Sequence, residues 1–265
     1  PDIGDLEVQY VTDVLRGGHL SMGPRLREFE DKFASYVGTR FAVATNSGTS
    51  ALHLIMRALE IGPEDEVITT SFSFFASAAC ILYGRALPVF VDIDPFTLNI
   101  DPAQIRSFLE ERCFKDPQSE GYIDRLTSRK VKAILPVHLF GLPSEMEPIM
   151  DLAAEYGLSV IEDACEALGA KYRGRNVGTF GRAAAFAFYP NKQLTTAEGG
   201  MIVTDDEPIA LLARSMRNQG RDTDSGWLQH VRLGYNYRLS DVHCAIGIAQ
   251  LESLPELLEL RSHGA

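Results

Sequence analysis

The chain has 265 residues, of which 45% are hydrophobic, and its 36 acidic residues outnumber 25 basic ones to give a net charge of −11. This length and apolar content suffice for one large domain or two smaller ones, whereas the acidic balance argues against a nucleic-acid-binding or polybasic membrane surface. No apolar run is long enough to span a bilayer.

The cysteines are far apart in the sequence and form no C-x-x-C motif. They are Cys80, Cys113, Cys165 and Cys244. This spacing predicts neither a metal site nor a disulfide framework. We therefore expect reduced thiols in a cytoplasmic protein.

Short apolar runs alternate with helical patterns from residue 41 onward. Runs rich in Val, Ile and Phe predict strands over residues 41–45, 65–71, 88–93, 131–138, 159–164, 183–188 and 199–204. Helical spacing predicts helices over residues 50–61, 74–84 and 145–157. Such alternation is typical of a three-layer α/β fold, in which a mainly parallel sheet is flanked by helices on both faces.

Two further segments have distinct patterns. The polar stretch over residues 115–130 predicts a surface excursion. From Leu239 the spacing is again helical, with Ser240 as the N-cap, and no glycine cap follows before the sequence ends. We expect the chain to stop inside or just after a long helix.

A predicted strand ends in the sequence Ser-Gly-Thr-Ser immediately before a helix. Gly48 lets a ligand approach the backbone, and the hydroxyls of Ser47 and Thr49 can donate hydrogen bonds. The free N–H groups at the start of the helix attract an anion such as a phosphate. Simple helix capping by Ser or Thr is the alternative interpretation.

Two other polar groups follow predicted strands. Glu162 and Asp163 come at the end of one strand, and Lys192 follows another. The carboxyl ends of parallel strands meet at the edge where α/β sheets bind ligands. Taken alone, an acidic pair is more often a cap or a solvated turn, and a single lysine more often reaches solvent.

The combination of these groups favours one cofactor, pyridoxal 5′-phosphate. This cofactor requires an anion site for its phosphate, a carboxylate for its ring nitrogen and a lysine amine for a Schiff base. Burial lowers the pKa of such a lysine and so provides neutral amine. An aromatic ring that stacks on the cofactor would come from Phe72, Phe74 or Phe75, although three phenylalanines are more often core.

Longer motifs carry a resemblance to a known family. They include "GPRLREFEDKFASYVGTRFAVATNSGTSALHL", "VIEDACEALGAKYRGRNVGTFG", "FAFYPNKQLTTAEGGMIVTDD" and "GYNYRLSDVHCAIGIAQLE". In order and content they resemble the DegT/DnrJ/EryC1/StrS family of sugar aminotransferases, which are fold-type I pyridoxal-phosphate enzymes. The resemblance covers residues 1–251.

The resemblance implies roles for individual residues. Lys192 is the lysine that binds the cofactor and moves a proton, and Asp163 pairs with the pyridine nitrogen. The resemblance also implies that Gly48 and Thr49 bind the phosphate of the cofactor and that Phe74 stacks on the cofactor ring. Asn236 is implied to reach the phosphate of the cofactor bound by a neighbouring subunit. The active site is then shared across a homodimer.

Three positions depart from the family pattern. Glu166 lies where many members carry Gln or His near the phenolic oxygen of the cofactor, so it either accepts a proton-bearing group or adds an unwanted negative charge. Ala187 replaces a phosphate-binding Ser, and Ala197 stands where Gly is usual. The first change removes a phosphate donor, and the second is expected to alter the loop.

The resemblance also divides the chain. Residues 1–240 correspond to the cofactor-binding large domain, and residues 241–265 to the start of a helix leading to a small C-terminal domain that we expect to be absent. That domain closes over the substrate in the family, so its loss would affect turnover more than cofactor binding.

The function implied by the resemblance is transamination, with Lys192 as the catalytic residue. The amino group passes from an amino acid, expected to be L-glutamate, to a nucleotide-linked keto-sugar. A dehydratase branch of the family has histidine in place of the lysine, so Lys192 argues against it. The alternatives are a truncated, non-catalytic relative that folds, dimerises and binds the cofactor, and an α/β phosphate binder without it.

Two remaining observations leave alternatives open. His138 either approaches the cofactor or hydrogen-bonds the backbone at a strand end. Arg217, Arg221 and Arg238 either face the anionic nucleotide or form surface ion pairs.

Overall fold

The computed structural model describes residues 2–117, 121–222 and 228–263. A mixed sheet forms its centre, with the strand order β1-β11-β10-β7-β6-β2-β3. These strands are β1 (Phe41–Thr45), β11 (Gly200–Thr204), β10 (Ala183–Ala187), β7 (Ser159–Asp163), β6 (Lys130–Ile134), β2 (Asp65–Thr70) and β3 (Leu87–Val91). Only β11 runs antiparallel to its neighbours in this order, which confirms the mainly parallel sheet.

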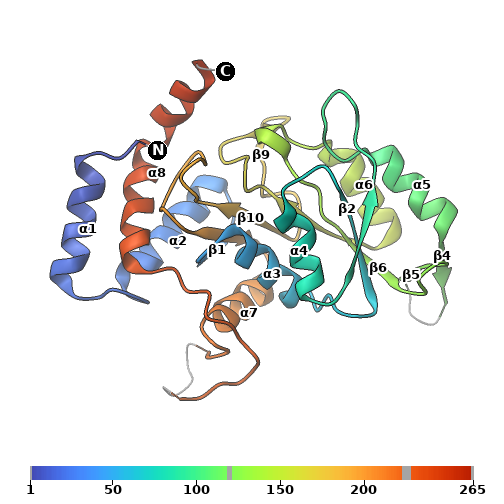
Figure 1. Ribbon diagram of the computed structural model, residues 1–265, viewed down its shortest axis with the longest axis horizontal. Coiled ribbons are helices and arrows are strands. Elements are labelled where there is room, and N and C mark those ends of the chain that lie inside the picture. Colours follow the sequence, from blue (N-terminus) through green and yellow to red (C-terminus); the bar gives the residue numbers. More distant parts are fainter. Residues whose placement is uncertain (1, 118–120, 223–227, 264–265) are drawn as a thin grey trace.

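Helices cover both faces of the sheet (Figure 1), as predicted. One face carries α3 (Gly48–Ala58), α4 (Phe75–Tyr83) and α7 (Glu207–Arg217). The other face carries α2 (Pro24–Val37), α5 (Pro102–Arg112) and α6 (Met146–Tyr156), while α1 (Asp5–Gly17) and α8 (Asp241–His263) form a further layer beside α2.

Strand alternation explains why both faces are apolar. In β1, Val43 belongs to the cluster under α3 and α7, whereas Ala42 and Ala44 belong to the cluster under α2 and α8. Successive side chains of a strand point to opposite faces. A strand buried on both sides must therefore be apolar at every position, which is the pattern that the sequence shows.

The segment predicted as a surface excursion is partly regular. β4 (Cys113–Asp116) and β5 (Gly121–Asp124) form an antiparallel hairpin, and β5 pairs with β6, so the hairpin extends the sheet. A separate small hairpin consists of β8 (Lys171–Tyr172) and β9 (Arg175–Asn176). One side of this edge faces solvent, so β4 and β5 carry polar side chains and have no apolar run that predicts a strand.

The predicted start of the last helix is confirmed. The hydroxyl of Ser240 accepts the backbone N–H of His243 at 3.3 Å, which is N-cap geometry. The carboxylate of Asp241, the first residue of α8, accepts the backbone N–H groups of Gly23 at 2.8 Å and Arg25 at 3.0 Å. α8 is thereby tied to the start of α2. The division into domains at residue 240 stays a prediction.

The sheet topology brings several chain segments to one edge. Because β1, β10, β7, β6 and β2 point the same way, their carboxyl ends lie together, and antiparallel β11 begins at the same edge. Ligands of α/β sheets bind at this edge. No helix among the described residues is long and apolar enough to cross a membrane.

Candidate functional site

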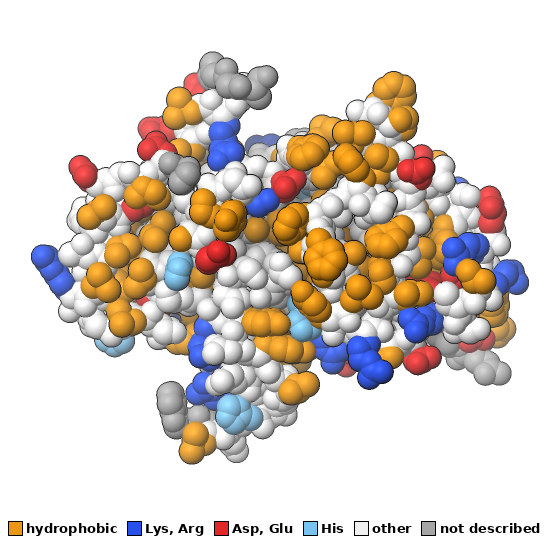
Figure 2. Space-filling model, viewed as in Figure 1, with side chains coloured by type: hydrophobic (Ala, Val, Ile, Leu, Met, Phe, Trp, Pro, Cys, Tyr) orange, Lys and Arg blue, Asp and Glu red, His pale blue; other side chains and the backbone are white. Residues whose placement is uncertain are grey.

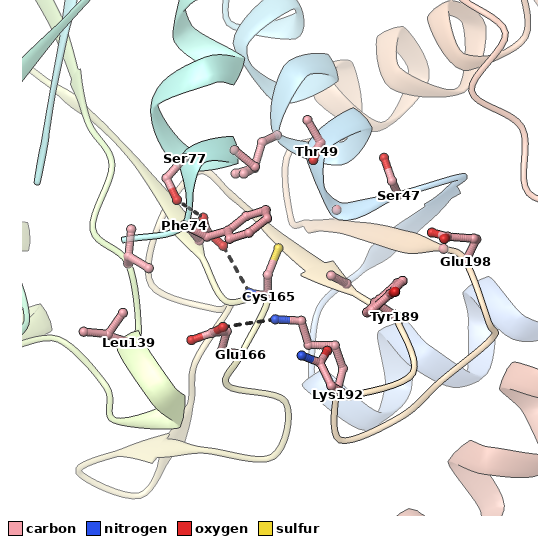
Figure 3. Close-up of a pocket in the computed structure, with 18 residues that line it drawn as sticks. Ser47, Thr49, Phe74, Ser77, Leu139, Cys165, Glu166, Tyr189, Lys192 and Glu198 are labelled. Carbon is pink, nitrogen blue, oxygen red and sulfur yellow. Dashed lines mark hydrogen bonds and ion pairs between the residues drawn. The ribbon is translucent and has the colours of Figure 1, made fainter. Parts of the chain in front are cut away.

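A cavity of about 350 Å³ lies at the carboxyl edge of the sheet (Figure 3). Its lining includes six of the seven residues that the sequence analysis assigned to the site: Gly48, Thr49, Phe74, Asp163, Glu166 and Lys192. They come from four different segments of the chain, and the fold brings them together. Cavities of this size typically hold small ligands.

The start of α3 forms one end of the cavity. The hydroxyl of Ser47 accepts the backbone N–H of Ser50 at 3.1 Å, so Ser47 is the N-cap. A Cβ atom added to Gly48 would lie 2.7 Å from the Cβ of Ala187 and 2.8 Å from the sulfur of Cys165. Only glycine therefore fits where α3 approaches β10 and the segment after β7.

The first turn of α3 keeps donors for an anion. Among the described residues, the backbone N–H groups of Gly48 and Thr49 and the hydroxyl of Thr49 have no hydrogen-bond partner. Ala187 also lines this end and contributes only a methyl group. The helix N-terminus and Thr49 thus supply the donors that Ala187 lacks.

Asp163 lies at the end of β7 and is only 5% exposed. One of its carboxylate oxygens accepts the hydroxyl of Ser77 at 2.6 Å, and the other accepts the backbone N–H of Cys165 at 3.2 Å. Two donors therefore fix the orientation of the carboxylate at the cavity wall.

The adjacent Glu162 has a different role, because neighbouring residues of a strand point to opposite sides. Its carboxylate is fully buried and accepts the backbone N–H groups of Gly178, Phe180 and Gly181 at 2.7–2.8 Å. Burial raises its pKa, but hydrogen bonds from His138 and these N–H groups outweigh that effect, and the net pKa is lowered. Glu162 therefore anchors a loop and does not line the cavity.

His138 is also structural. Its Nδ1 accepts the backbone N–H of Ser144 at 3.1 Å, so its proton resides on Nε2, which donates to Glu162 at 3.1 Å. The side chain is fully buried and lies outside the lining of the cavity. The interpretation of His138 as a backbone-bonded residue is the correct one.

Lys192 forms an ion pair with Glu166 in the cavity. Its Nζ atom donates to Glu166 at 3.1 Å, and the two side chains are 18% and 30% exposed. The second carboxylate oxygen of Glu166 accepts the backbone N–H of Phe140 at 3.0 Å. Figure 3 shows Lys192 and Glu166 directed toward one another, with Cys165 beside them.

The phenylalanines after β2 are not core residues, contrary to their more common role. Phe72 is 46% exposed, Phe74 75% and Phe75 74%. Phe74 precedes the first residue of α4 and lines the cavity, where its ring is free to stack on a ligand. Figure 2 shows hydrophobic side chains gathered on the central part of this face.

Asn236 is the one predicted site residue that lies outside the cavity of its own chain. It is exposed and bridges to Asn218 in an isolated antiparallel pair. Arg217 does not face a ligand either: it is 4% exposed and donates to the buried carboxylate of Glu30 and, at 2.7 Å, to the carbonyl of Ala44.

Several cavity residues were not predicted from the sequence. Ser77 binds Asp163 from a helix 86 positions away, and Cys165, Tyr189 and Glu198 also line the cavity. Burial, followed by the charge of Asp163, raises the pKa of the Cys165 thiol well above its usual range, so this thiol is protonated and a poor nucleophile. The sequence offered one signal for Ser77, Cys165, Tyr189 and Glu198, which is that each lies within a few positions of a residue assigned to the site.

The site has the three groups that define a class of protein: a helix N-terminus with free N–H donors, a buried carboxylate and a lysine amine around one cavity. This arrangement is the one that pyridoxal-phosphate enzymes of the α/β type require. The free donors of Gly48 and Thr49 fit the phosphate, and the fixed carboxylate of Asp163 fits a ring nitrogen. The residues present therefore fit this cofactor.

The sequence profile of the DegT/DnrJ/EryC1/StrS aminotransferase family matches residues 1–265, and the chain belongs to this family. GDP-perosamine synthase from Caulobacter vibrioides is 43% identical over 241 residues, which are 91% of this chain and 60% of that protein. Aminotransferases of this family depend on pyridoxal phosphate.

Solved structures share the fold. The aminotransferase from Psychrobacter cryohalolentis is similar with a TM-score of 0.86 and 34% sequence identity. The matched region covers 97% of this chain and 63% of the Psychrobacter chain. NtdA from Bacillus subtilis, with the bound cofactor PMP, has a TM-score of 0.82 at 31% identity and covers 95% of this chain and 54% of its own. The chain thus spans less than two thirds of the length of these relatives.

Proposed function

We propose that this chain is the cofactor-binding part of an aminotransferase that moves an amino group from an amino acid, L-glutamate, to a keto-sugar attached to a nucleotide. The observation that carries the proposal is that Lys192, Asp163 and the start of α3 line one cavity. The names GDP-perosamine synthase and spore coat polysaccharide biosynthesis protein SpsC support a sugar substrate.

Four of the cavity residues have a place in the proposed cofactor site. Gly48 and Thr49 bind the phosphate at the start of α3, and the exposed ring of Phe74 covers one face of the cofactor ring. The carboxylate of Asp163, fixed by Ser77, would accept a hydrogen bond from the protonated ring nitrogen and so keep it protonated. When bound, pyridoxal phosphate supplies an electron sink for the negative charge that develops on the substrate carbon.

Lys192 performs the proton transfer in this proposal. Its Nζ atom would hold the cofactor and, once free, would accept the proton that leaves the α-carbon of the donor and return it to the cofactor. Glu166 lies 3.1 Å from Nζ and holds the displaced amine within the cavity. The same steps in reverse deliver the amino group to the keto-sugar.

A homodimer is part of the proposal. Large apolar side chains are exposed at the cavity, at Phe74, and along α4, at Phe75, Leu82 and Tyr83. An apolar face of this kind favours a protein partner. Asn236 is exposed and outside its own cavity, which supports a role at the cavity of a neighbouring subunit.

We also propose that the protein is located in the cytoplasm. All four cysteines are free thiols, and three of them are buried. Unpaired cysteines are typical of reducing compartments.

The first test is the absorption spectrum of the purified chain after pyridoxal phosphate is added, before and after L-glutamate. We expect a yellow band that requires Lys192 and disappears with glutamate, because transfer of the amino group leaves the cofactor as an amine without the conjugated C=N bond. Lys192→Ala should bind the phosphate group but give no lysine-bound band and no transamination. Lys171→Ala, on the exposed hairpin β8–β9, is the matched control.

The outcomes separate the alternatives. A yellow band that ignores glutamate and other amino-acid donors would favour the non-catalytic cofactor binder. Absence of any band in the wild-type chain, or full transamination by Lys192→Ala, would overturn the assignment.

A further inference from the structure

Helix α8 contacts the backbone of the lysine segment. A guanidinium nitrogen of Arg261 lies 2.6 Å from the carbonyl oxygen of Lys192 and 3.4 Å from that of Asn191. These are charge-assisted hydrogen bonds to the residue that carries the reactive amine and to its neighbour. Arg261 is 69 positions from Lys192, so the contact depends on the tertiary position of α8.

Helical spacing directs Arg261 to this place. Leu254, Leu258 and Arg261 follow one another at intervals of four and three residues and therefore lie on one stripe of α8. Leu254 is fully buried, and a Cβ atom added to Gly169 would lie 2.5 Å from Leu258. The packed leucines thus set the position of the last turns, and Arg261 extends the same stripe to the lysine segment.

The helix itself is weakened just before these contacts. Pro255 lies inside α8 and has no N–H to donate to the carbonyl of Leu251. The last two turns therefore depend more on side-chain contacts for their direction. Arg261 is one of those contacts, so the position of this end of the helix and that of the lysine segment are coupled.

A second cavity makes the contact important for the lysine. This cavity, of about 330 Å³, lies between the lysine segment, α8 and the start of the chain, and its lining includes Lys192, Gln193, Gln250 and Arg261. On that side the segment has open space behind it in place of packed side chains. Hydrogen bonds across the cavity must restrain the backbone there.

We propose that Arg261 is a positioning residue for Lys192 and that it couples the end of α8 to the reactive lysine. The inference rests on the proposed function of Lys192. Restraint of the carbonyls of residues 191 and 192 holds the Cα atom of Lys192 so that its side chain is directed into the active-site cavity. Because coupling between two sites is reciprocal, attachment of the cofactor to Lys192 then stabilises the end of α8.

The first experiment uses the cofactor-free chain and needs no activity. Backbone amide hydrogen exchange is measured over residues 189–194 in the wild type, Arg261→Ala, Arg261→Lys and the solvent-side control Glu256→Ala. We expect Arg261→Ala to exchange about tenfold faster there, because it loses a charge-assisted hydrogen bond. Arg261→Lys, which keeps one donor to the carbonyls, should be intermediate, and Glu256→Ala should match the wild type.

The second experiment measures the coupling. Attachment of pyridoxal phosphate to Lys192, followed by its absorbance, should be roughly three- to tenfold slower in Arg261→Ala. Bound cofactor should protect the amides of residues 258–262 in the wild type and leave them unchanged in Arg261→Ala. Unchanged exchange over residues 189–194 in Arg261→Ala would overturn the inference, whatever the cofactor does. No absorbance band in the wild type would instead count against the proposed function.

Discussion

The side-chain amine of Lys192 lies 3.1 Å from one carboxylate oxygen of Glu166, and the other oxygen accepts the backbone N–H of Phe140 at 3.0 Å. Phe140 has a φ of 52°, a left-handed conformation that is unfavourable for a bulky residue. The fold therefore holds this N–H toward Glu166 at a cost in strain. An amine that attaches to the cofactor must first leave this fixed ion pair.

Glu166→Gln should accelerate the attachment of pyridoxal phosphate. Both side chains are partly exposed, so the ion pair contributes less than about 1 kcal/mol, and its loss corresponds to a rate increase of about two- to fivefold. The free energy of unfolding should change by less than about 1 kcal/mol. Absorbance after rapid mixing with cofactor gives the rate, and denaturant unfolding gives the stability.

Glu198→Gln is the matched control for this variant. Glu198 also lines the cavity, and its substitution removes one negative charge as well, but among the described residues its carboxylate forms no hydrogen bond or ion pair with Lys192. If both variants accelerate attachment equally, the effect is one of general charge, and the ion pair does not limit the rate.

Ser77→Ala should weaken cofactor binding by about tenfold or more, because a hydrogen bond to a carboxylate contributes roughly 1.5–3 kcal/mol. The fully buried hydroxyl of Ser77 is one of two donors that fix the carboxylate of Asp163. The remaining donor, the N–H of Cys165, leaves the carboxylate free to rotate away from the ring nitrogen. An absorbance titration with pyridoxal phosphate measures the dissociation constant.

Ser73→Ala provides the comparison, since its hydroxyl bonds only the neighbouring carbonyl of Phe74 in an exposed segment. We expect wild-type affinity for that variant. Equal affinities of Ser77→Ala and the wild type would show that Asp163 needs no support from α4.

The edge on which the site lies could be predicted from the sequence for a physical reason. Apolar runs identified the parallel strands, and the carboxyl ends of parallel strands must meet at one edge. Any polar group directly after such a strand, such as Asp163 or Lys192, therefore belongs to a common region. The family motifs then selected seven residues, six of which line one cavity.

Side-chain directions were not predictable in the same way. Glu162 and Asp163 are adjacent, and only the three-dimensional sheet decides which of them faces the cavity and which binds the loop at Gly178. The contact of Ser77 with Asp163 spans 86 positions. Likewise, the contact between Phe140 and Glu166 depends on a local backbone conformation that no residue type there requires.

Ala197→Gly should stabilise the chain by about 0.5–1 kcal/mol. A non-glycine residue in the left-handed region costs roughly 1–2 kcal/mol, and glycine removes this cost. Part of the gain is lost because glycine has greater conformational freedom in the unfolded chain. Ala197 has a φ of 69°. The loop thus keeps the conformation suited to the glycine expected there, and the alanine adopts it under strain. Denaturant unfolding measures the difference.

The control for this variant is Ala76→Gly, within the first turn of α4, where helical geometry makes glycine unfavourable. That variant should be less stable than the wild type. A loss of stability of similar size in Ala197→Gly would mean that the backbone of Ala197 is not strained in this conformation.

His53 should make the chain less stable in mild acid. It is 5% exposed, its Nδ1 lies 3.2 Å from the hydroxyl of Tyr237, and its Nε2 has no hydrogen-bond partner among the described residues. Burial, followed by the charge of Arg57, lowers the pKa of His53 from 6.5 to about 4. The folded chain therefore favours the neutral ring.

The sign of the pH effect follows from this lowered pKa. Below pH 6.5 the unfolded chain binds a proton at His53 that the folded chain does not bind until about pH 4, so stability is lost across this interval. Between pH 7 and pH 5 the loss due to His53 is about 2 kcal/mol. His53→Phe, which fills the site without a titrating group, should reduce the drop in unfolding free energy between these two pH values by that amount. Denaturant unfolding of both proteins at pH 7 and pH 5 measures it, and an identical drop in the two would show that His53 is protonated as easily in the folded chain as in the unfolded one.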